Sequence, residues 1–321
     1  MKTIVINKQF IEIINEKIPD KKNLVNIISD ILPLEREAVY RRLRNEVPFT
    51  FSEIVSLSRA LSISVDNVIG LEECRNLYHY QMVDYFYPNR FDYAKMENFL
   101  ELLQYIIKEP FSEFAELTNI LPQSLYLRYN ALTRFFIFRW RYHHHFRIDS
   151  QKKFQEFKIP SKIAEIQKKY IESVRHINET IFIWDHNIVR DIVDDIHEFI
   201  YLDYIKNEDL KLLKDELFYL LNDIEEISLS GCYPETEKKV SIYISDLSID
   251  TNYGYIETIT HKISLMKVYS FNTISSLREN SLNTMKNWID SYKSFSTLIS
   301  ASGGKNRFEF IQKQKDIINN L

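Results

Sequence analysis

Glycine is scarce in this chain, with five residues in 321. A dinucleotide-binding turn needs the pattern G-x-G-x-x-G, and a phosphate-binding loop needs G-x-x-x-x-G-K-[ST]. Neither pattern can be written anywhere in the sequence. The scarcity of glycine therefore excludes the two classes of nucleotide-binding enzyme that depend on these turns.

Cysteine and long apolar runs are also scarce. The two cysteines, Cys74 and Cys232, lie far apart and lack C-x-x-C spacing, so neither a disulfide framework nor a cysteine zinc site is indicated. No apolar run reaches the length of a membrane span, and residues 1–17 are too polar for a secretory signal. We therefore expect a cytoplasmic protein that makes no membrane contact.

Spacings that unite a nucleophile, a base and an orienting group are missing as well. The chain has no G-x-S-x-G and no H-E-x-x-H pattern among its serines, histidines and carboxylates. The sequence thus predicts no catalytic residue, no metal site and no cofactor. We expect that the protein is not an enzyme.

What the sequence does contain is typical of a folded protein with more than one domain. Hydrophobic residues make up 45% and charged residues 27%, which indicates a globular chain. A length of 321 residues suits two or three domains. The formal net charge of -4 is unusual for a dedicated nucleic-acid binder, so such a function would depend on local charge.

Residues 23–45 have the pattern of two short helices joined by a tight corner. The apolar stripe of the first helix consists of Leu24, Ile27, Ile28 and Ile31. Leu32-Pro33-Leu34 forms the corner, and the second helix keeps Val39 and Leu43 on one face. Four arginines also lie on this second helix. This is the layout of a helix-turn-helix, which places its second helix in the major groove of B-DNA.

Further helices are expected on both sides of this pair. Residues 7–17 carry apolar residues at helical spacing. A capping box, Thr50-Phe51-Ser52-Glu53, opens a fourth helix. A short fifth helix follows over residues 65–69, with Ser64 as its cap and Gly70 as its stop. Five short helices in 70 residues predict one compact domain.

These residues carry a resemblance to a known family. Residues 23–70 resemble the lambda-repressor-like, Xre-type DNA-binding domains, five-helix units whose second and third helices form the helix-turn-helix. The matching positions are the apolar Ile28, Leu32, Leu34 and Val39, the small Ser29, and the tail LSRALSISVDNVI at 57–69. Pro33 stands where glycine is usual, and Arg42 stands where an apolar residue is common. These departures predict a different turn geometry and a different seating of the second helix.

The resemblance implies a sequence-specific transcriptional regulator that binds double-stranded DNA. The residues that it implies contact base edges are Glu35, Arg36, Glu37, Tyr40, Arg41 and Arg44. Those that it implies contact phosphates are Lys21, Lys22 and Asn23. Arginine can pair with guanine and glutamate with cytosine. The alternative is that these are solvated side chains on two surface helices. Because one unit reads only a few base pairs, we expect a bacterial homodimer on paired half-sites, located in the cytoplasm and at the nucleoid when bound.

Residues 74–321 resemble the C-terminal part of some bacterial regulators of this kind, which carries no motif of known chemistry. The expected helices are 78–86, 93–107, 123–147, 162–183, 187–205, 208–229, 274–299 and 307–320. Alternating residues predict a small antiparallel sheet of two or three strands near 238–271. The predicted fold is mainly α, with a DNA-binding domain at 1–73 and a larger helical domain at 74–321 that dimerises or senses a small-molecule or protein signal.

Three clusters in this second region each have two interpretations. Residues 128–147 hold five arginines among aromatic residues and form either an anion or DNA site or, as we favour, a core helix whose arginines pair with acids. Residues 184–199 form either a metal site or a solvated acidic face, which can pair with 128–147 within one chain or across a dimer. The third cluster, either a dimer seam or a core helix, is Val174, Ile177, Ile181, Trp184 and Ile188.

Three functional hypotheses follow from these patterns. The first is a transcriptional regulator that reads DNA through the helix-turn-helix. The second is a protein-interaction scaffold or ligand sensor with a vestigial helix-turn-helix. The third is a metal-dependent enzyme that uses Asp191, Asp195 and Glu198, which no catalytic spacing in the sequence supports.

Overall fold

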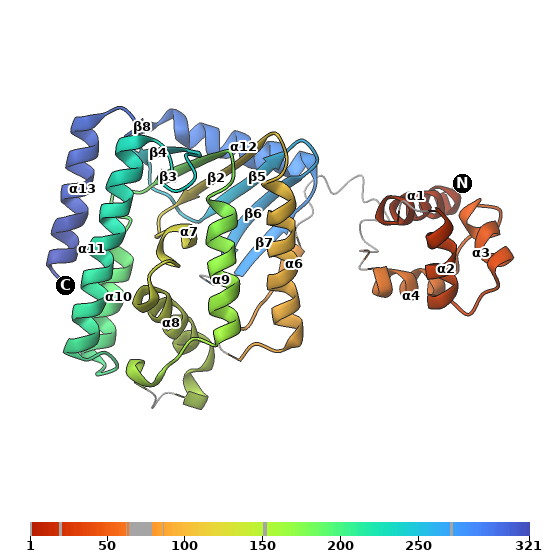
Figure 1. The fold of residues 1–321 in the computed structure, drawn as a ribbon, viewed down its shortest axis with the longest axis horizontal. Helices are drawn as coiled ribbons and strands as arrows, with labels where there is room; N and C mark the ends of the chain where they lie inside the picture. Colours follow the sequence, from red (N-terminus) through yellow and green to blue (C-terminus); the bar gives the residue numbers. More distant parts are fainter. Residues whose placement is uncertain are drawn as a thin grey trace. The chain divides into compact units, whose positions relative to one another are not determined.

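The chain folds into two units, Met1–Arg75 and Asn76–Leu321. The computed structural model describes residues 2–18, 21–61, 63, 79–85, 87–149, 153–269 and 272–321 (Figure 1). Across these ranges no helix combines the length and the apolar character needed to cross a bilayer.

In the described part of the first unit, the regular secondary structure consists of helices. Its helices are α1 (Lys2–Lys17), α2 (Lys21–Ile31), α3 (Arg36–Leu43) and α4 (Phe51–Leu61). The core that holds them together includes Phe10, Ile14, Ile28, Val39 and Leu57, none of which is exposed. The four helices expected from the sequence are therefore confirmed. The fifth, expected over residues 65–69, lies outside the described residues.

The second unit is built on a mixed sheet that has eight strands in the described residues. The strands are β1 (His79–Gln81), β2 (Ser112–Thr118), β3 (Glu179–Trp184), β4 (Lys239–Ser245), β5 (Tyr253–Thr258), β6 (Lys262–Val268), β7 (Asn272–Ser276) and β8 (Ser296–Leu298). Their order across the sheet is β1-β7-β6-β5-β2-β3-β4-β8. β2, β3 and β4 pair in parallel, and the remaining pairs are antiparallel.

Helices cover both faces of this sheet (Figure 1). They are α6 (Arg90–Ile106), α7 (Gln123–Tyr126), α8 (Asn130–Asp149), α9 (Ser161–Val174), α10 (Arg190–Tyr201), α11 (Asn207–Ser230), α12 (Glu279–Ser294) and α13 (Gly304–Asn319), with a short 3-10 turn at Phe154–Glu156. Alternate residues of β2 serve the two faces: Phe114 joins the larger helical core, whereas Ala115 and Leu117 pack with residues of α12. The sheet is thus buried on both sides.

The predicted mainly α class with a small antiparallel sheet is wrong. Only part of the sheet lies at 238–271, and β4 within that segment pairs in parallel with β3. Parallel strands are buried on both faces and read as continuous apolar runs, which period-based reasoning does not separate from buried helix. The β3 sequence ETIFIW is such a run, and residues 179–183 of it fall at the end of the helix predicted over 162–183.

Several predicted helices change accordingly. The helix expected at 162–183 ends at Val174, and β3 begins at Glu179. The segment 78–86 contains β1, and 274–299 contains the end of β7, α12 and β8. The stripe Val174, Ile177, Ile181, Trp184 and Ile188 belongs to α9, β3 and the turns beside β3. It is buried within this chain, so both the dimer seam and the single core helix were wrong interpretations.

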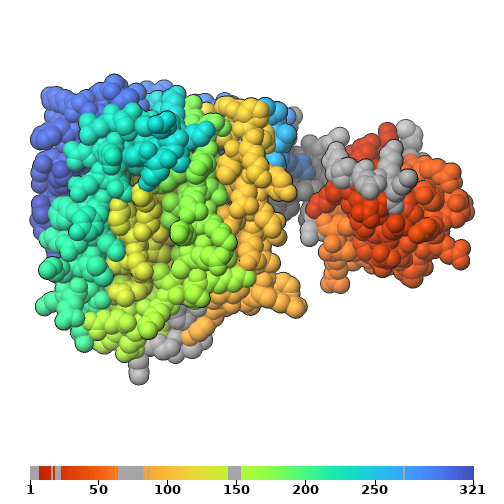
Figure 2. Space-filling view, in the orientation of Figure 1, coloured from red at the N-terminus to blue at the C-terminus, as the bar shows by residue number. Residues whose placement is uncertain are grey.

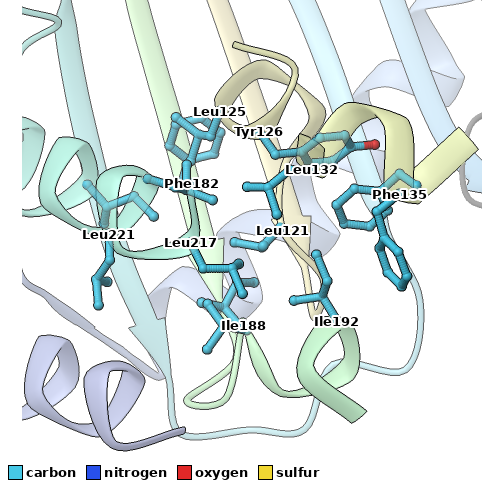
Figure 3. Close-up of a cluster of buried hydrophobic side chains, with 14 of the residues drawn as sticks. Leu121, Leu125, Tyr126, Leu132, Phe135, Phe182, Ile188, Ile192, Leu217 and Leu221 are labelled. Carbon is cyan, nitrogen blue, oxygen red and sulfur yellow. The ribbon is translucent and has the colours of Figure 1, made fainter. Parts of the chain in front are cut away.

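The aromatic and arginine-rich segment 128–147 packs as we favoured. Figure 3 shows part of the core around it, with Leu121, Leu125, Tyr126, Leu132, Phe135, Phe182, Ile188, Ile192, Leu217 and Leu221. Three of its arginines pair with acids of the neighbouring helices: Arg134 lies 3.1 Å from Asp209, and Arg139 contacts Asp195. Arg128 lies 3.2 Å from Asp223. The acidic and basic segments therefore neutralise each other within one chain.

Candidate nucleic-acid interface

The corner between α2 and α3 is built without a left-handed residue. The Leu32 N–H donates to the Ile28 carbonyl at 2.8 Å, and the Leu34 N–H donates to the Leu32 carbonyl at 2.7 Å. None of the four described corner residues, 32–35, has a positive φ. Proline is restricted to a φ near −65° and is compatible with such a corner, which does not require the freedom of glycine. Pro33 therefore fits this corner, and glycine is not required at this position.

Arg42 holds α3 against α4 through a carboxylate. Its Nε and Nη2 each donate to one oxygen of Glu53 at 2.8 Å, and each of the two side chains is 14% exposed. Such two-pronged, charge-assisted bonds are among the stronger polar contacts in proteins. A shielded ion pair thus holds α3 against α4.

Glu53 also closes the predicted capping box of α4. It accepts from the Thr50 N–H at 2.8 Å, and its own N–H donates to Thr50 Oγ1 at 3.3 Å. Burial raises the pKa of Glu53, but the bonds from Arg42 and Thr50 outweigh this effect and leave the pKa below its ordinary value of 4.5. One charged carboxylate therefore fixes both the start of α4 and the seating of α3.

All six side chains predicted to meet base edges lie on the exposed side of α3. Glu35, Arg36, Glu37, Tyr40, Arg41 and Arg44 are exposed, whereas Val39 on the opposite side is completely buried. Tyr40 is 45% exposed, so its ring and hydroxyl are accessible. The helix thus presents a continuous polar face that its own core does not use.

The arginines of this face make weak local contacts. Arg44 lies 3.2 Å from Glu37 and 3.3 Å from Glu46, and Arg41 lies 3.7 Å from Glu46. Exposed ion pairs of this type contribute about 0–1 kcal/mol. Releasing these guanidinium groups to another acceptor therefore costs little free energy.

Of the three predicted phosphate contacts, the structure describes one side chain. Asn23 is exposed in the first turn of α2, while the side chains of Lys21 and Lys22 lie outside the described residues. Residues 1–75 contain 11 lysines and arginines and 11 acids, so this unit has no net positive charge. Any affinity for DNA must therefore come from placement of charge and not from its total.

A residue that the sequence reasoning missed supports the segment after α3. Asn7 of α1 is 3% exposed, donates to Asn45 Oδ1 at 2.5 Å and accepts from the Phe49 N–H at 2.9 Å. Asn45 has a φ of 59°, a left-handed conformation that asparagine tolerates better than most residues. The signal was present in the sequence, since Asn7 is a polar residue on the same helical face as Phe10 and Ile14.

The acidic residues proposed for metal binding are arranged differently from a metal site. Asp191, Asp194 and Asp195 line a polar hollow of about 400 Å³ together with Arg139, which pairs with Asp195. Burial and the neighbouring carboxylates raise the pKa of Asp191. In the part of the chain that the structure describes, no three His, Cys, Asp or Glu side chains are placed to hold one ion.

No family model, curated protein or solved structure matches this chain.

Proposed function

We propose that the chain is a sequence-specific, DNA-binding transcriptional regulator of the bacterial cytoplasm, and that α3 enters the major groove. The observation that carries this proposal is the exposed polar face of α3, opposite a side that is sealed by Val39 and by the Arg42–Glu53 pair. A helix held in this way can present side chains to base edges without losing its own packing. The resemblance of residues 23–70 to Xre-type domains supports the same assignment.

Each side chain on this face has a chemical role in the proposal. Arg36, Arg41 and Arg44 would donate to guanine O6 and N7, and Glu35 and Glu37 would accept from cytosine N4. Tyr40 adds a hydroxyl and an apolar ring that can contact a thymine methyl group. Lys21, Lys22 and Asn23, at the first turn of α2, would hold a phosphate and set the register of the unit on the duplex.

The decisive experiment selects bound sequences from a random DNA pool with the full-length protein. The selected duplex is then titrated with wild type, Arg44→Ala and Arg59→Ala by fluorescence anisotropy at fixed salt. Arg59 is exposed on α4 and is not on the polar face of α3, so it serves as a charge-matched control. We expect Arg44→Ala to weaken binding roughly tenfold or more, the value of one good base contact, and Arg59→Ala to bind nearly as wild type.

Two results would count against the proposal. One is a pool in which no sequence is enriched at moderate salt. The other is an equal effect of both variants, which would show that only total charge matters.

The balanced charge of residues 1–75 favours a second candidate, a scaffold or ligand sensor with a vestigial helix-turn-helix. Arg36, Arg41 and Arg44 are offset by the nearby carboxylates Glu35, Glu37 and Glu46. On this alternative the pool selection yields no site, while the second unit still binds a molecule. The two candidates are therefore separated by the same selection experiment.

A further inference from the structure

The second unit contains a mostly apolar cavity of about 240 Å³. Its floor is the sheet face that carries Phe114, Ile256 and Ile263, and its walls include Met96 and Leu103 of α6 and Val174 of α9. These two helices pack side by side (Figure 2), and Figure 1 shows them in front of the sheet. Pockets that bind small molecules have this character, an apolar lining with a few placed polar groups.

One part of the cavity lining is a shielded ion pair. Glu116 of β2 is 4% exposed and pairs with Lys267 of β6. β5 runs between these strands, and Gly254 lies directly opposite Glu116 in the register. Because Gly254 has no side chain, the two charged groups can meet across β5. Their charges cancel, so this wall is polar without carrying net charge.

A second polar group in the lining lacks a partner. Gln167 of α9 is 7% exposed, and its side-chain amide makes no hydrogen bond to any residue that the structure describes. Its amide atoms keep some accessible surface and are not fully buried. The amide can therefore donate to and accept from the polar head of a molecule in the cavity.

Tyr170, one turn further along α9, lines the same cavity. Burial and the charge of Glu116 raise the pKa of its phenol well above the ordinary value of 10. The hydroxyl therefore stays protonated and can donate a hydrogen bond at neutral pH.

We propose that this cavity binds a small uncharged molecule with an apolar body and a hydrogen-bonding head, the head directed to Gln167 and the Glu116–Lys267 pair. Lys95, the other charged residue in the described lining, lies 4.0 Å from Asp92, so a charged head would enter a site in which each charge already has a partner. The volume lies just below the roughly 300–1,000 Å³ of pockets for drug-sized ligands, which indicates a body of one or two rings or a short chain. The inference does not depend on DNA binding.

The test uses three probes with one body and different heads. Naphthalen-2-ylmethanol is neutral, 2-naphthoate is an anion and naphthalen-2-ylmethylamine is a cation at pH 7. Each is titrated into the full-length protein by calorimetry in the absence of DNA. We expect saturable binding of the alcohol that is at least tenfold tighter than binding of either charged probe. No saturable binding of the alcohol, or equal binding of all three, would overturn the proposal.

Two variants locate the binding. Gln167→Leu keeps the approximate shape and removes the amide, so we expect the alcohol to bind about fivefold to tenfold more weakly. Gln312→Leu makes the same change at an exposed position of α13, and this variant should bind the alcohol as wild type does. Val174→Phe fills the cavity and should abolish binding, with the unfolding transition of the variant measured in parallel. Wild-type affinity in Gln167→Leu would contradict the assignment even if Val174→Phe does not fold.

Discussion

The Arg42–Glu53 pair shows how shielding from solvent separates a structural arginine from exposed arginines that are free to contact a partner molecule. Four arginines lie from Arg36 to Arg44, and the resemblance already sets Arg42 apart from the expected base contacts, at a position where an apolar residue is common. The structure shows what holds Arg42, because its Nε and Nη2 bind Glu53 and each of the two side chains is 14% exposed. The remaining three stay on the exposed face. Shielding from solvent, which the order of residues does not reveal, separates the two groups.

The first residue-scale prediction concerns the stability of the first unit. Arg42→Ala should lower the free energy of opening of α3 and α4 by about 2 kcal/mol, because a charge-assisted pair is lost and Glu53 is left partly buried without its partner. Amide hydrogen exchange over residues 36–61 measures this value locally. Arg59→Ala, an exposed change on α4, should alter it by no more than about 0.5 kcal/mol. Equal protection in all three proteins would refute the role of the pair.

The same pair has a defined pH dependence. The pKa of Glu53 is lowered in the folded state, so its contribution is present above the ordinary value of 4.5 and is lost as pH falls through the folded pKa. The difference between wild type and Arg42→Ala should therefore be constant near neutral pH and shrink below about pH 4.5. A difference that grows on acidification would contradict this assignment.

At the level of elements, the β5–β6 hairpin is tied to the segment after α6. Glu109 accepts from Thr258 Oγ1 at 2.9 Å and from the Thr260 N–H at 3.1 Å, and it lies 3.0 Å from His261 Nδ1. Burial raises the pKa of Glu109, but these contacts, led by Thr260, outweigh it and lower the pKa to about 2. A single carboxylate thus organises the turn that joins two antiparallel strands.

The element-scale prediction follows from that pKa. Glu109→Gln removes the charge that the turn stabilises, so thermal unfolding of the second unit should occur at a lower temperature at neutral pH. Because the folded pKa is depressed, the difference from wild type should persist down to the ordinary value of 4.5 and disappear as pH falls towards 2. Circular dichroism melts between pH 7 and pH 2 measure it. An unchanged melting temperature at pH 7 would show that the turn does not depend on this charge.

Elements also show which parts of the fold sequence patterns could predict. Spacing and capping patterns predicted α2, α3 and the capping box of α4 correctly. Each of these features depends on residues that lie only a few positions apart in the sequence. β2 was missed entirely, and β3 was merged into a helix, because strands buried on both faces lack alternation. Their pairing joins residues more than 60 positions apart, such as Phe114 with Thr180. No local pattern records a contact of that range.

At the scale of the whole molecule, the shortness of α3 limits the number of base pairs that one copy of the chain would contact in the proposed complex. Eight residues span only part of a major-groove turn, so we propose that two copies occupy two half-sites about one helical turn apart. In our proposal, the cavity of the second unit binds a small molecule. A regulator with this organisation would couple the two events through a shared free energy.

The whole-molecule prediction concerns half-site spacing. Inserting about 5 bp between the half-sites of a selected duplex turns the second one to the opposite side of the helix, whereas inserting about 10 bp restores its face. We expect the shorter insertion to weaken binding of the full-length protein more than the longer one, as measured by anisotropy. A single half-site bound as tightly as the intact duplex would argue for a monomeric reader.

The sequence by itself determined the helices of the first unit, the polar composition of α3 and the charge complementarity between residues 128–147 and the acidic segments. These features depend on neighbours within a few turns of helix or on net composition, so order alone specifies them. Only the tertiary structure decided the mixed sheet, the shielding of Arg42 and the cavity that brings Glu116 to Lys267, 151 positions later. The physical reason is that burial and pairing depend on which distant segments meet, and that choice is made by packing of the whole core.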